Sequence, residues 1–430
     1  MFDFLREMIW IIASGMIFLC GIYFSFKLNF IHLNFSKMIK AIKEKPDNKV
    51  SISSFQSLAM SLAGRIGVGS LSGIALAVYL GGPGVIFWIW LTSILCATTT
   101  FAESLLAGVY RKKNGNVYEG GPFYYIKEGL KNHPLAFIYA FIILVSFISG
   151  FLSIQVNTIS KCVNEIIHIQ PIIIGFIIAI LAGITIFGGV KRIADTTGKL
   201  VPIMTLFYVS VCLFIIIVNI NFIPGVFVTI INNALNFKSF GFGILATLLI
   251  GMQKGIFSSE VGLGTGSIAG ATADTKSPVN TGLVQTFGIH IENLLLATLT
   301  VFVICLSNYQ NIVIRDANGI ELTLFAFKYH LGNFGPLFIV ITIILFGLST
   351  VLTGYYYGET SLKFIKKTNK FDLFIFKIIT LIVIIIASFI SSNLIWMIVD
   401  VMVGFIAIIN IYALWKLRES VIATYYKEIN

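Results

Sequence analysis

The chain has 430 residues, of which 57% are hydrophobic and only 11% are charged, and its mean hydropathy is +0.93. A soluble protein carries roughly 25% charged residues, so this composition excludes a soluble globular domain and indicates a membrane protein with many spans. The net charge of +11 does not indicate nucleic-acid binding, because the basic residues lie between the apolar runs, where they set membrane orientation.

Apolar runs of about 20 residues can cross the hydrocarbon core of a bilayer as helices. We therefore predict an all-α polytopic membrane protein, a single transmembrane domain over residues 1–430 with about eleven transmembrane helices. An apolar segment at 221–237 carries Pro224 and several asparagines, and we predict an interfacial helix or a re-entrant loop there. The predicted spans are residues 8–26, 55–80, 84–108, 135–157, 172–188, 200–219, 240–270, 280–307, 334–358, 372–391 and 393–415.

The loops between these spans differ in their content of basic residues. If the amino terminus is outside, 22 lysines and arginines lie in cytoplasmic segments and 5 lie outside. Cytoplasmic loops are enriched in lysine and arginine. We therefore predict a multi-pass protein of the cell membrane with its amino terminus outside, its carboxyl terminus in the cytoplasm, and the loops 27–54, 109–134 and 358–371 on the cytoplasmic side.

The span 55–80 contains a run of small residues, LAGRIGVGSLSG, with four glycines and two serines. Such a run predicts a discontinuous helix with Gly67 to Gly73 unwound. Unwound backbone is tolerated in a membrane only where it is buried in protein or lines a cavity, and there its amides and carbonyls can bind a ligand. The alternative is close helix packing through small residues.

A second interruption, GMQKGIFSSEVGLGTGSIAGA at 251–271, places Lys254 and Glu260 inside an apolar span. An ionisable residue at membrane depth is a functional candidate, and the alternative is a structural Lys–Glu pair that stabilises a kink. Two glycine-interrupted helices, one early in each half, indicate an inverted-repeat transporter with a site near the bilayer midplane. The repeats would be residues 55–219 and 240–415, and the span 8–26 an extra amino-terminal helix.

Further polar side chains lie within the spans. Gln155 and Asn157 either face a ligand or bond across helices, which contributes on the order of 1 kcal/mol. The hydroxyls of Ser349, Thr350 and Thr353 usually bond to their own helix, but a dehydrated sodium ion needs such neutral oxygens. Buried ionisable residues suggest three pairs: a packed pair or proton relay of His290 with Glu292, and gating or structural salt bridges of Glu103 with Arg111 and of Glu359 with Lys363.

Several motifs occur together and in a fixed order: GRIGVGSLSG, LGGPGVIFWIW, TFAESLLAGVYR, GGPFYYI, IQVNTIS, GGVKRIAD, KLVP, QKGIFSSEVGLG and GYYYGE. In this combination the chain resembles the alanine or glycine:cation symporter family, from about Ser57 to Glu359. That family consists of sodium-coupled amino-acid symporters with a leucine-transporter-like fold. The resemblance therefore implies this fold, with two five-helix inverted repeats and discontinuous helices. Where the family pattern has asparagine, this chain has Ser70 and Ser259.

A zwitterionic amino acid fits the two interruptions. Its carboxylate needs amide donors and a helix N-terminus, and its ammonium group needs carbonyls or a carboxamide. The resemblance favours Gln155 as a substrate contact and, through the eighth core helix, a hydroxyl pair for sodium. The predicted substrate residues are Gly67, Val68, Gly69, Ser70, Gln155, Phe257, Ser258 and Ser259, and the predicted sodium ligands are Ala63, Ile66, Ser349 and Thr350.

The sequence thus predicts a monomeric symporter that imports a small neutral amino acid with co-transported sodium. The favoured substrate is alanine or glycine, because the glycine residues of the site leave room for only a small side chain. Glutamine is a second possible substrate, because Ser70 in place of asparagine alters the pocket. The expected partners are this amino acid and the lipid bilayer, with no nucleic acid. One alternative is a proton-coupled transporter of the same fold. An ion channel would need a repeated filter, and a membrane enzyme would need a cluster of catalytic residues; the sequence contains neither.

Overall fold

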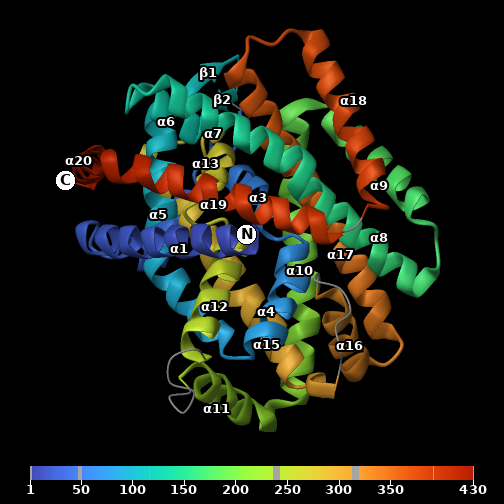
Figure 1. Cartoon of the computed structure of the whole chain (residues 1–430). Coiled ribbons are helices and arrows are strands. Elements are labelled where there is room, and N and C mark those ends of the chain that lie inside the picture. Colours follow the sequence, from blue (N-terminus) through green and yellow to red (C-terminus); the bar gives the residue numbers. More distant parts are fainter. Residues whose placement is uncertain are drawn as a thin grey trace.

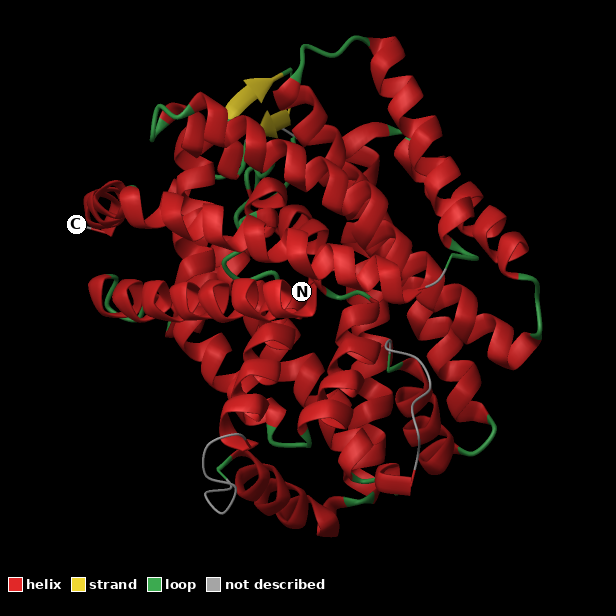
Figure 2. Cartoon of the chain, in the orientation of Figure 1, coloured by secondary structure: helices red, strands yellow, loops and turns green. Residues whose placement is uncertain are grey.

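The computed structural model describes residues 2–46, 51–115, 117–235, 243–311, 319–390 and 392–429. Nearly all of the described elements are helices, and they pack into one bundle (Figure 1). Figure 2 shows two short strands at one end of that bundle.

The elements are numbered in chain order, and η denotes a 3-10 or π-helix. From residue 2 to residue 234 they are α1 (Phe2–Lys27), η1 (Ile31–Leu33), α2 (Phe35–Ile42), α3 (Ser54–Arg65), η2 (Gly69–Gly73), α4 (Ile74–Gly81), α5 (Val85–Tyr110), β1 (Lys112–Asn114), β2 (Val117–Glu119), α6 (Pro122–Glu128), α7 (His133–Val145), η3 (Ser146–Phe151), α8 (Leu152–Ile167), α9 (Pro171–Ile186), α10 (Gly189–Val218), η4 (Ile220–Phe222) and α11 (Ile223–Ala234). From residue 243 onward they are α12 (Gly243–Ser259), α13 (Thr265–Gly270), α14 (Pro278–Ile289), η6 (His290–Leu296), α15 (Ala297–Cys305), η7 (Tyr309–Asn311), α16 (Ile320–Leu331), α17 (Phe334–Ile365), α18 (Lys370–Ala387), α19 (Ser392–Lys416) and α20 (Arg418–Ile429).

Seven of the described helices are long and apolar enough to cross a membrane, or eight if the bent pair of α3 with η2 and α4 is one span. The predicted spans 8–26, 84–108, 334–358 and 393–415 correspond to α1, α5, α17 and α19, and 280–307 corresponds to the unit α14–η6–α15. The predicted spans 172–188, 240–270 and 372–391 contain the helices α9, α12 with α13, and α18, but these helices are too short or too polar to count as membrane spans by length and composition. Residues 240–242 and 391 lie outside the described ranges. The described helices therefore support seven or eight of the predicted eleven transmembrane helices by length and composition.

Two predicted boundaries were wrong because the predicted spans are parts of longer helices. The span 135–157 belongs to an apolar helical unit of 35 residues, His133–Ile167. The span 200–219 belongs to α10, which begins at Gly189 and includes Pro202. The first turns of α10 carry Lys191, Arg192 and Asp195, which end the apolar run in the sequence but do not prevent helix formation. The segment predicted as an interfacial helix forms α11, and its last residues lie outside the described ranges.

The helix α3 lies near the centre of the bundle, in contact with α10, α13, α14 and α17. Every residue from 57 to 78 is buried, so the middle of this interrupted helix is covered by protein on all sides. In Figure 1, α1 runs beside α19, and both helices also contact α5. The helices α9 and α18 pack on each other at the periphery and expose large apolar side chains such as Ile177 and Phe374, as expected of lipid-facing helices.

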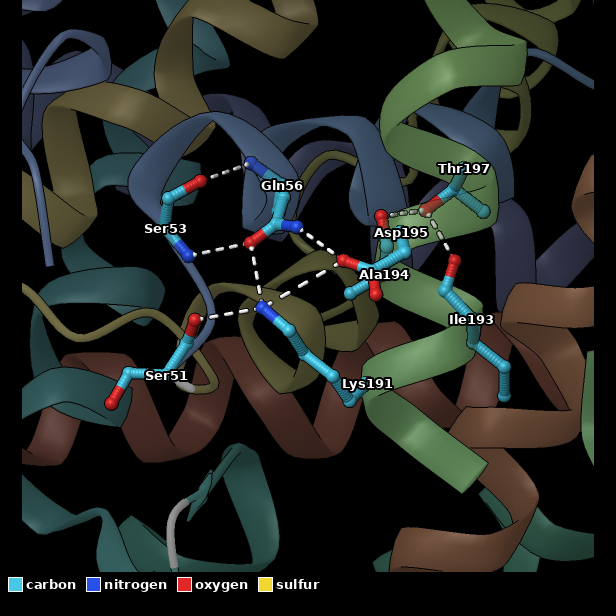
Figure 3. A network of polar contacts seen from close by, with 8 residues as sticks. All are labelled: Ser51, Ser53, Gln56, Lys191, Ile193, Ala194, Asp195 and Thr197. Carbon is cyan, nitrogen blue, oxygen red and sulfur yellow. Dashed lines mark hydrogen bonds and ion pairs between the residues drawn. The ribbon is translucent and has the colours of Figure 1, made fainter. Parts of the chain in front are cut away.

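The beginning of α3 is tied to α10 by polar contacts (Figure 3). Ser53 and Gln56 form a capping box at the N-terminus of α3, which satisfies free amide groups of the first turn. Gln56 Nε2 donates to Asp195 Oδ1 at 2.6 Å, and Lys191 Nζ donates to Ser51 O at 2.9 Å. The first interrupted helix is therefore fixed at the end away from its break.

The expectation of an all-α fold misses a small antiparallel hairpin in which Lys112 pairs with Glu119. The side chain of Glu119 reaches α17, where Lys363 Nζ lies 3.1 Å from Glu119 Oε1 and 2.8 Å from Glu359 Oε1. The predicted salt bridge between Glu359 and Lys363 is thereby confirmed. The hairpin follows α5 in the chain and contacts α17 near its end through this ion pair.

Candidate functional site

The first interrupted helix breaks at only two residues. α3 ends at Arg65, Ile66 and Gly67 are not helical, and the chain resumes in η2 and α4, bent by 51° from α3. The expected unwinding from Gly67 to Gly73 was too long, because Gly69 to Gly73 form a π-helix. A π-helical turn often occurs at functional sites, and here it continues the chain directly after the bend.

At the break, two side chains from neighbouring helices lie close to the backbone of Gly67. A Cβ atom there would lie 2.6 Å from Thr350 Oγ1 and 2.8 Å from Gln155 Oε1, so glycine alone fits without displacement. The next amide, Val68 N, donates to Gln155 Oε1 at 2.9 Å. We expected the carboxamide to meet the substrate ammonium group, but its oxygen already accepts this amide. Its Nε2 group makes no hydrogen bond to any described residue and can donate to a ligand.

The residues predicted to bind sodium lie at or beside the break, and three of them contact one another. On α17, Thr350 Oγ1 lies 2.8 Å and Ser349 Oγ 3.5 Å from the carbonyl oxygen of Ala63. Both hydroxyls also donate to Phe346 O within α17, at 3.0 Å and 2.7 Å. Among the described residues, no side chain donates to the carbonyl of Ile66. Three neutral oxygens from two helices therefore meet at the carboxyl-terminal end of α3, where the helix dipole favours a cation.

Open space lies on the other side of the break. A Cβ atom on Gly69 would have only Phe257 Cε1 nearby, at 4.0 Å, and one on Gly73 would have no atom within 4 Å. Phe257 belongs to the last turn of α12, and its ring stacks on Phe151 with centroids 5.3 Å apart. The space beside Gly69 is thus bordered by an aromatic ring from the second interrupted helix.

The second interruption is a turn with left-handed backbone. α12 ends at Ser259 and α13 begins at Thr265. Between them Glu260, Gly262 and Gly264 have φ angles of +57°, +75° and +82°. Glycine adopts such angles without steric cost, whereas Glu260 does so against its Cβ. Glu260 Oε2 accepts a hydrogen bond from Thr265 Oγ1 at 2.7 Å, which closes the turn on itself.

The carbonyls of this turn are already bonded to protein side chains. Asn410 on α19 donates through Nδ2 to Gly262 O and to Glu103 Oε2, both at 2.9 Å. The hydroxyl of Tyr139 on α7 donates to Leu263 O. Buried backbone groups require partners, and these side chains supply them without a ligand. The turn therefore has less left to offer a substrate than the first break.

One buried carboxylate joins the two interrupted helices. Glu292 on η6 accepts through Oε1 from Ser70 Oγ at 2.6 Å and also from Ser258 Oγ. Ser259 Oγ instead donates to Gly255 O at 2.6 Å within its own helix. The three serines predicted as substrate contacts therefore direct their hydroxyls into the protein. These serines can therefore contact a ligand only through their backbone amide and carbonyl groups.

The sequence did not identify this role of Glu292. The predicted pair with His290 was wrong, because His290 Nε2 contacts His32 O at 2.8 Å, and residues two apart on a helix point in different directions. A usable signal was present, since a carboxylate within an apolar span needs hydroxyl or amide donors. Both interrupted helices carry serines that could donate to Glu292, but they lie far from it in the sequence, so the pairing could not be predicted.

Two other pairs considered from the sequence do not form. Lys254 does not pair with Glu260; its Nζ lies 5.3 Å from the ring centroid of Trp396. Glu103 does not pair with Arg111, whose guanidinium instead donates to backbone carbonyls of the 273–275 segment. Of the two carboxamide side chains, Gln155 accepts a hydrogen bond from the backbone at the break. Asn157 instead donates to carbonyls at the end of α18, so it bonds across helices as the packing alternative predicts.

Arg65, the last residue of α3, is the largest of the fully buried side chains. Its Nη1 donates to Gln285 O at 3.0 Å. A Cβ atom on Gly266 would lie 2.2 Å from its Nη2, and one on Gly288 would lie 2.3 Å from its Nη1. The guanidinium therefore threads between α13 and α14 through gaps that only glycine leaves open.

The chain is similar to known transporters along its whole length. The model of the sodium:alanine symporter family matches residues 1–428. The amino-acid carrier protein AlsT of Bacillus subtilis (strain 168) is 36% identical over 428 residues, covering 99% of this chain and 90% of that protein. The probable sodium/glutamine symporter GlnT of the same organism is 37% identical over 405 residues, covering 93% and 84%. A solved Na+-coupled sialic acid symporter, in a substrate-bound outward-open state, shares the fold with a TM-score of 0.55 at 12% identity over 98% of this chain and 84% of that one.

Proposed function

This chain belongs to the sodium:alanine symporter family, and we propose that it couples the import of a small neutral amino acid to the entry of sodium. Members of this family are transporters, and the chain is a multi-pass membrane transporter rather than an enzyme. The observation that carries the proposal is the break at Ile66 and Gly67, where a bent helix meets the hydroxyls of α17 and the carboxamide of Gln155.

Sodium would bind between α3 and α17. Ala63 O, Ser349 Oγ and Thr350 Oγ1 offer neutral oxygens, which suit a dehydrated monovalent cation in a buried site. When sodium is bound, the two hydroxyls would turn from Ala63 O toward the ion while they still donate to Phe346 O. Ile66 O is the fourth proposed ligand, since the helix has ended there and its carbonyl has no described side-chain donor.

The substrate would lie between the two interruptions. Its carboxylate would meet the backbone from Gly67 to Ser70 at the beginning of η2, where the helix dipole is positive, and the Nε2 group of Gln155. Its ammonium group would meet the carbonyls of Phe257 to Ser259 at the end of α12, where the dipole is negative. The Phe257 ring beside Gly69 limits the side chain, which favours alanine or glycine over glutamine.

The test is uptake by purified protein in proteoliposomes. Labelled alanine, glycine and glutamine are supplied with an inward sodium gradient, or with choline in place of sodium and an imposed proton gradient. We expect accumulation of alanine or glycine only with sodium. Equal accumulation in choline driven by protons would support the proton-coupled alternative, and ion currents without amino-acid uptake would support a channel.

We also propose the orientation and architecture predicted from the sequence: two five-helix repeats at 55–219 and 240–415, a monomer, and an external amino terminus. The basic loops support this orientation. A cysteine placed at Lys40 in a cysteine-free background should be protected from a membrane-impermeant maleimide in intact cells. Ready labelling there, with no further gain after permeabilisation, would reverse the topology.

A further inference from the structure

The chain turns sharply after its first membrane-spanning helix. α1 ends at Lys27, and Asn29 and Phe30 then adopt left-handed backbone with φ angles of +50° and +52°. The hydroxyl of Tyr425 on α20 donates to Leu28 O at 3.0 Å and ties this turn to the carboxyl-terminal helix. The short helices η1 and α2 follow at once, so α2 begins close to the point where the span of α1 ends.

Aromatic and basic side chains gather at this end of α1 and α19. The rings of Tyr23 and Trp415 meet edge to face with centroids 5.0 Å apart. Trp415 and Tyr412 are exposed, and Arg418 and Lys416 lie over their rings at 5.2 Å and 5.8 Å. Exposed tryptophan and tyrosine beside basic residues are typical of the boundary between hydrocarbon and water. The end of α1 therefore lies at the level of the lipid headgroups.

The helix α2 has one apolar face that packs on the protein and a second that stays exposed. Met38 and Ala41 are buried, where α2 contacts α14 and α3. Phe35 and Ile39 are one helical turn apart and are 44% and 43% exposed, and Leu33, just before the helix, is exposed as well. A single exposed apolar side chain is ordinary, but a cluster of them beside a membrane span suits contact with lipid.

The remaining exposed positions around α2 carry positive charge. Five lysines between residues 27 and 45 are all exposed: Lys27, Lys37, Lys40, Lys43 and Lys45. Among the described residues, none of these lysines forms an ion pair within 4.0 Å. The acidic residue of this stretch, Glu44, accepts from Lys276 N at 3.0 Å and from Asn280 Nδ2 at 2.9 Å, so its carboxylate faces the beginning of α14. The outer surface of the segment is therefore strongly basic.

We propose that residues 27–45, the α2 surface, bind the anionic headgroups of phospholipids in the leaflet at which α1 ends. A helix with lysines beside exposed apolar side chains lies in the plane of a membrane surface, and basic clusters next to a span attract anionic lipids. Phe35 and Ile39 enter the boundary of the acyl chains, and the lysines contact headgroup phosphates. With the orientation proposed above, this leaflet is the cytoplasmic one.

The first experiment measures lipid affinity of the purified full-length protein in a neutral detergent. Fluorescent short-chain phosphatidylglycerol is the anionic probe, and the matching phosphatidylcholine is the neutral one. The test variant removes three charges from the α2 surface: Lys37→Gln/Lys40→Gln/Lys43→Gln. The matched control removes three other exposed lysines from loops predicted to lie on the same side of the membrane: Lys113→Gln/Lys367→Gln/Lys370→Gln.

We expect wild type to bind phosphatidylglycerol more tightly than phosphatidylcholine, and the test variant to lose about ten- to a hundredfold in affinity for phosphatidylglycerol. The control variant should bind as wild type does. The preference should weaken in salt, because the Debye length falls from about 10 Å at 0.1 M to about 3 Å at 1 M. Equal affinity of wild type for both lipids would overturn the proposal. An equal loss in the control variant would also overturn it, because net charge alone would then explain the binding.

The second experiment keeps every lysine of the α2 surface, so it does not depend on how the charge variants fold. A fluorophore is attached to a cysteine at Ile39, or at Lys113 as the control, in cysteine-free protein in nanodiscs. Brominated acyl chains should quench the label at Ile39 when phosphatidylglycerol is present, and should not quench it at Lys113. No quenching at Ile39, together with binding of soluble polyglutamate, would assign the surface to an acidic protein instead. Both experiments are independent of transport, so absence of amino-acid uptake would overturn only the proposed function.

Discussion

The backbone groups that are freed at the two helix interruptions have different kinds of partners. At the first, the chain opens for two residues and its groups meet side chains that a ligand can replace or join: Gln155 at Val68 N, and the hydroxyls of α17 at Ala63 O. At the second, the turn is held by permanent protein contacts from Asn410 and Tyr139. We propose that the first break binds ligands, whereas protein contacts already hold the backbone of the second.

This difference shows that a glycine-rich interruption is not by itself a binding site. Gly69 faces open space, whereas Gly264 is surrounded by Pro122, Tyr139 and Asn410. Glu292 accepts hydrogen bonds from Ser70 after the first break and from Ser258 at the end of α12, so it connects the two interrupted helices. Four substitutions test the comparison, from the largest expected effect on binding to the smallest.

The largest effect is expected from Gly69→Leu. The new side chain would fill the space between the backbone and Phe257, so transport and substrate binding should be abolished while the protein still folds. Gly69→Ala is the control, because its Cβ would have a single neighbour at 4.0 Å and should leave measurable uptake. The measurement is substrate binding per mole of folded, purified protein. Normal binding by folded Gly69→Leu would remove the first break from the site.

The next effect is expected from Ser349→Ala together with Thr350→Ala. Both changes remove oxygens that approach Ala63 O, and a buried cation cannot replace them with water at low cost. The sodium concentration for half-maximal uptake should rise by about tenfold or more, if each lost ligand costs on the order of 1 kcal/mol. Thr342→Ala on the same helix is the control, since its hydroxyl bonds only to Phe338 O. An unchanged sodium dependence would reject this assignment.

A moderate effect is expected from Gln155→Ala. The substitution removes the acceptor of Val68 N and the proposed donor to the substrate carboxylate. A hydrogen bond to a charged group contributes about 1.5–3 kcal/mol, so the substrate Kd should rise by about ten- to a hundredfold. Gln155→Glu separates the two roles, because it keeps an acceptor for Val68 N but presents a second oxygen to the carboxylate. Substrate affinity near that of wild type in Gln155→Glu would show that only the contact with Val68 matters.

The smallest effect on binding is expected from Gly264→Ala. The φ angle of +82° and a distance of 2.4 Å from the new Cβ to Pro122 Cγ would destabilise the fold, by at least the 1–3 kcal/mol typical of backbone strain. The apparent Tm should fall, while the folded fraction binds substrate with unchanged Kd. Gly115→Ala, with φ of +61° and open surroundings, isolates the backbone cost. A weaker Kd in folded Gly264→Ala would place the second turn in the binding site.

Local sequence patterns predicted the two interruptions, because glycine runs and charged residues inside apolar spans are local signals. They also predicted the Glu359–Lys363 salt bridge, whose members are one helical turn apart. They did not predict the roles of Glu292 or Asn410, because these depend on partners 34 to 307 residues away. The direction of the Ser70 hydroxyl was equally hidden: a serine beside a break can face a ligand or a neighbouring helix, and only packing decides.

The burial of Arg65 has a consequence for how the protein is made. Its hydrogen-bond partner, the carbonyl of Gln285, follows 220 residues later in the chain. When α3 leaves the ribosome, the guanidinium has none of its final neighbours, and an arginine at the centre of a helix costs about 2.5–3.5 kcal/mol to insert. The glycines at 266 and 288 that make room for it are also not yet synthesised. We therefore expect the first interrupted helix to reach its final depth in the bilayer only after the second half of the protein has been made.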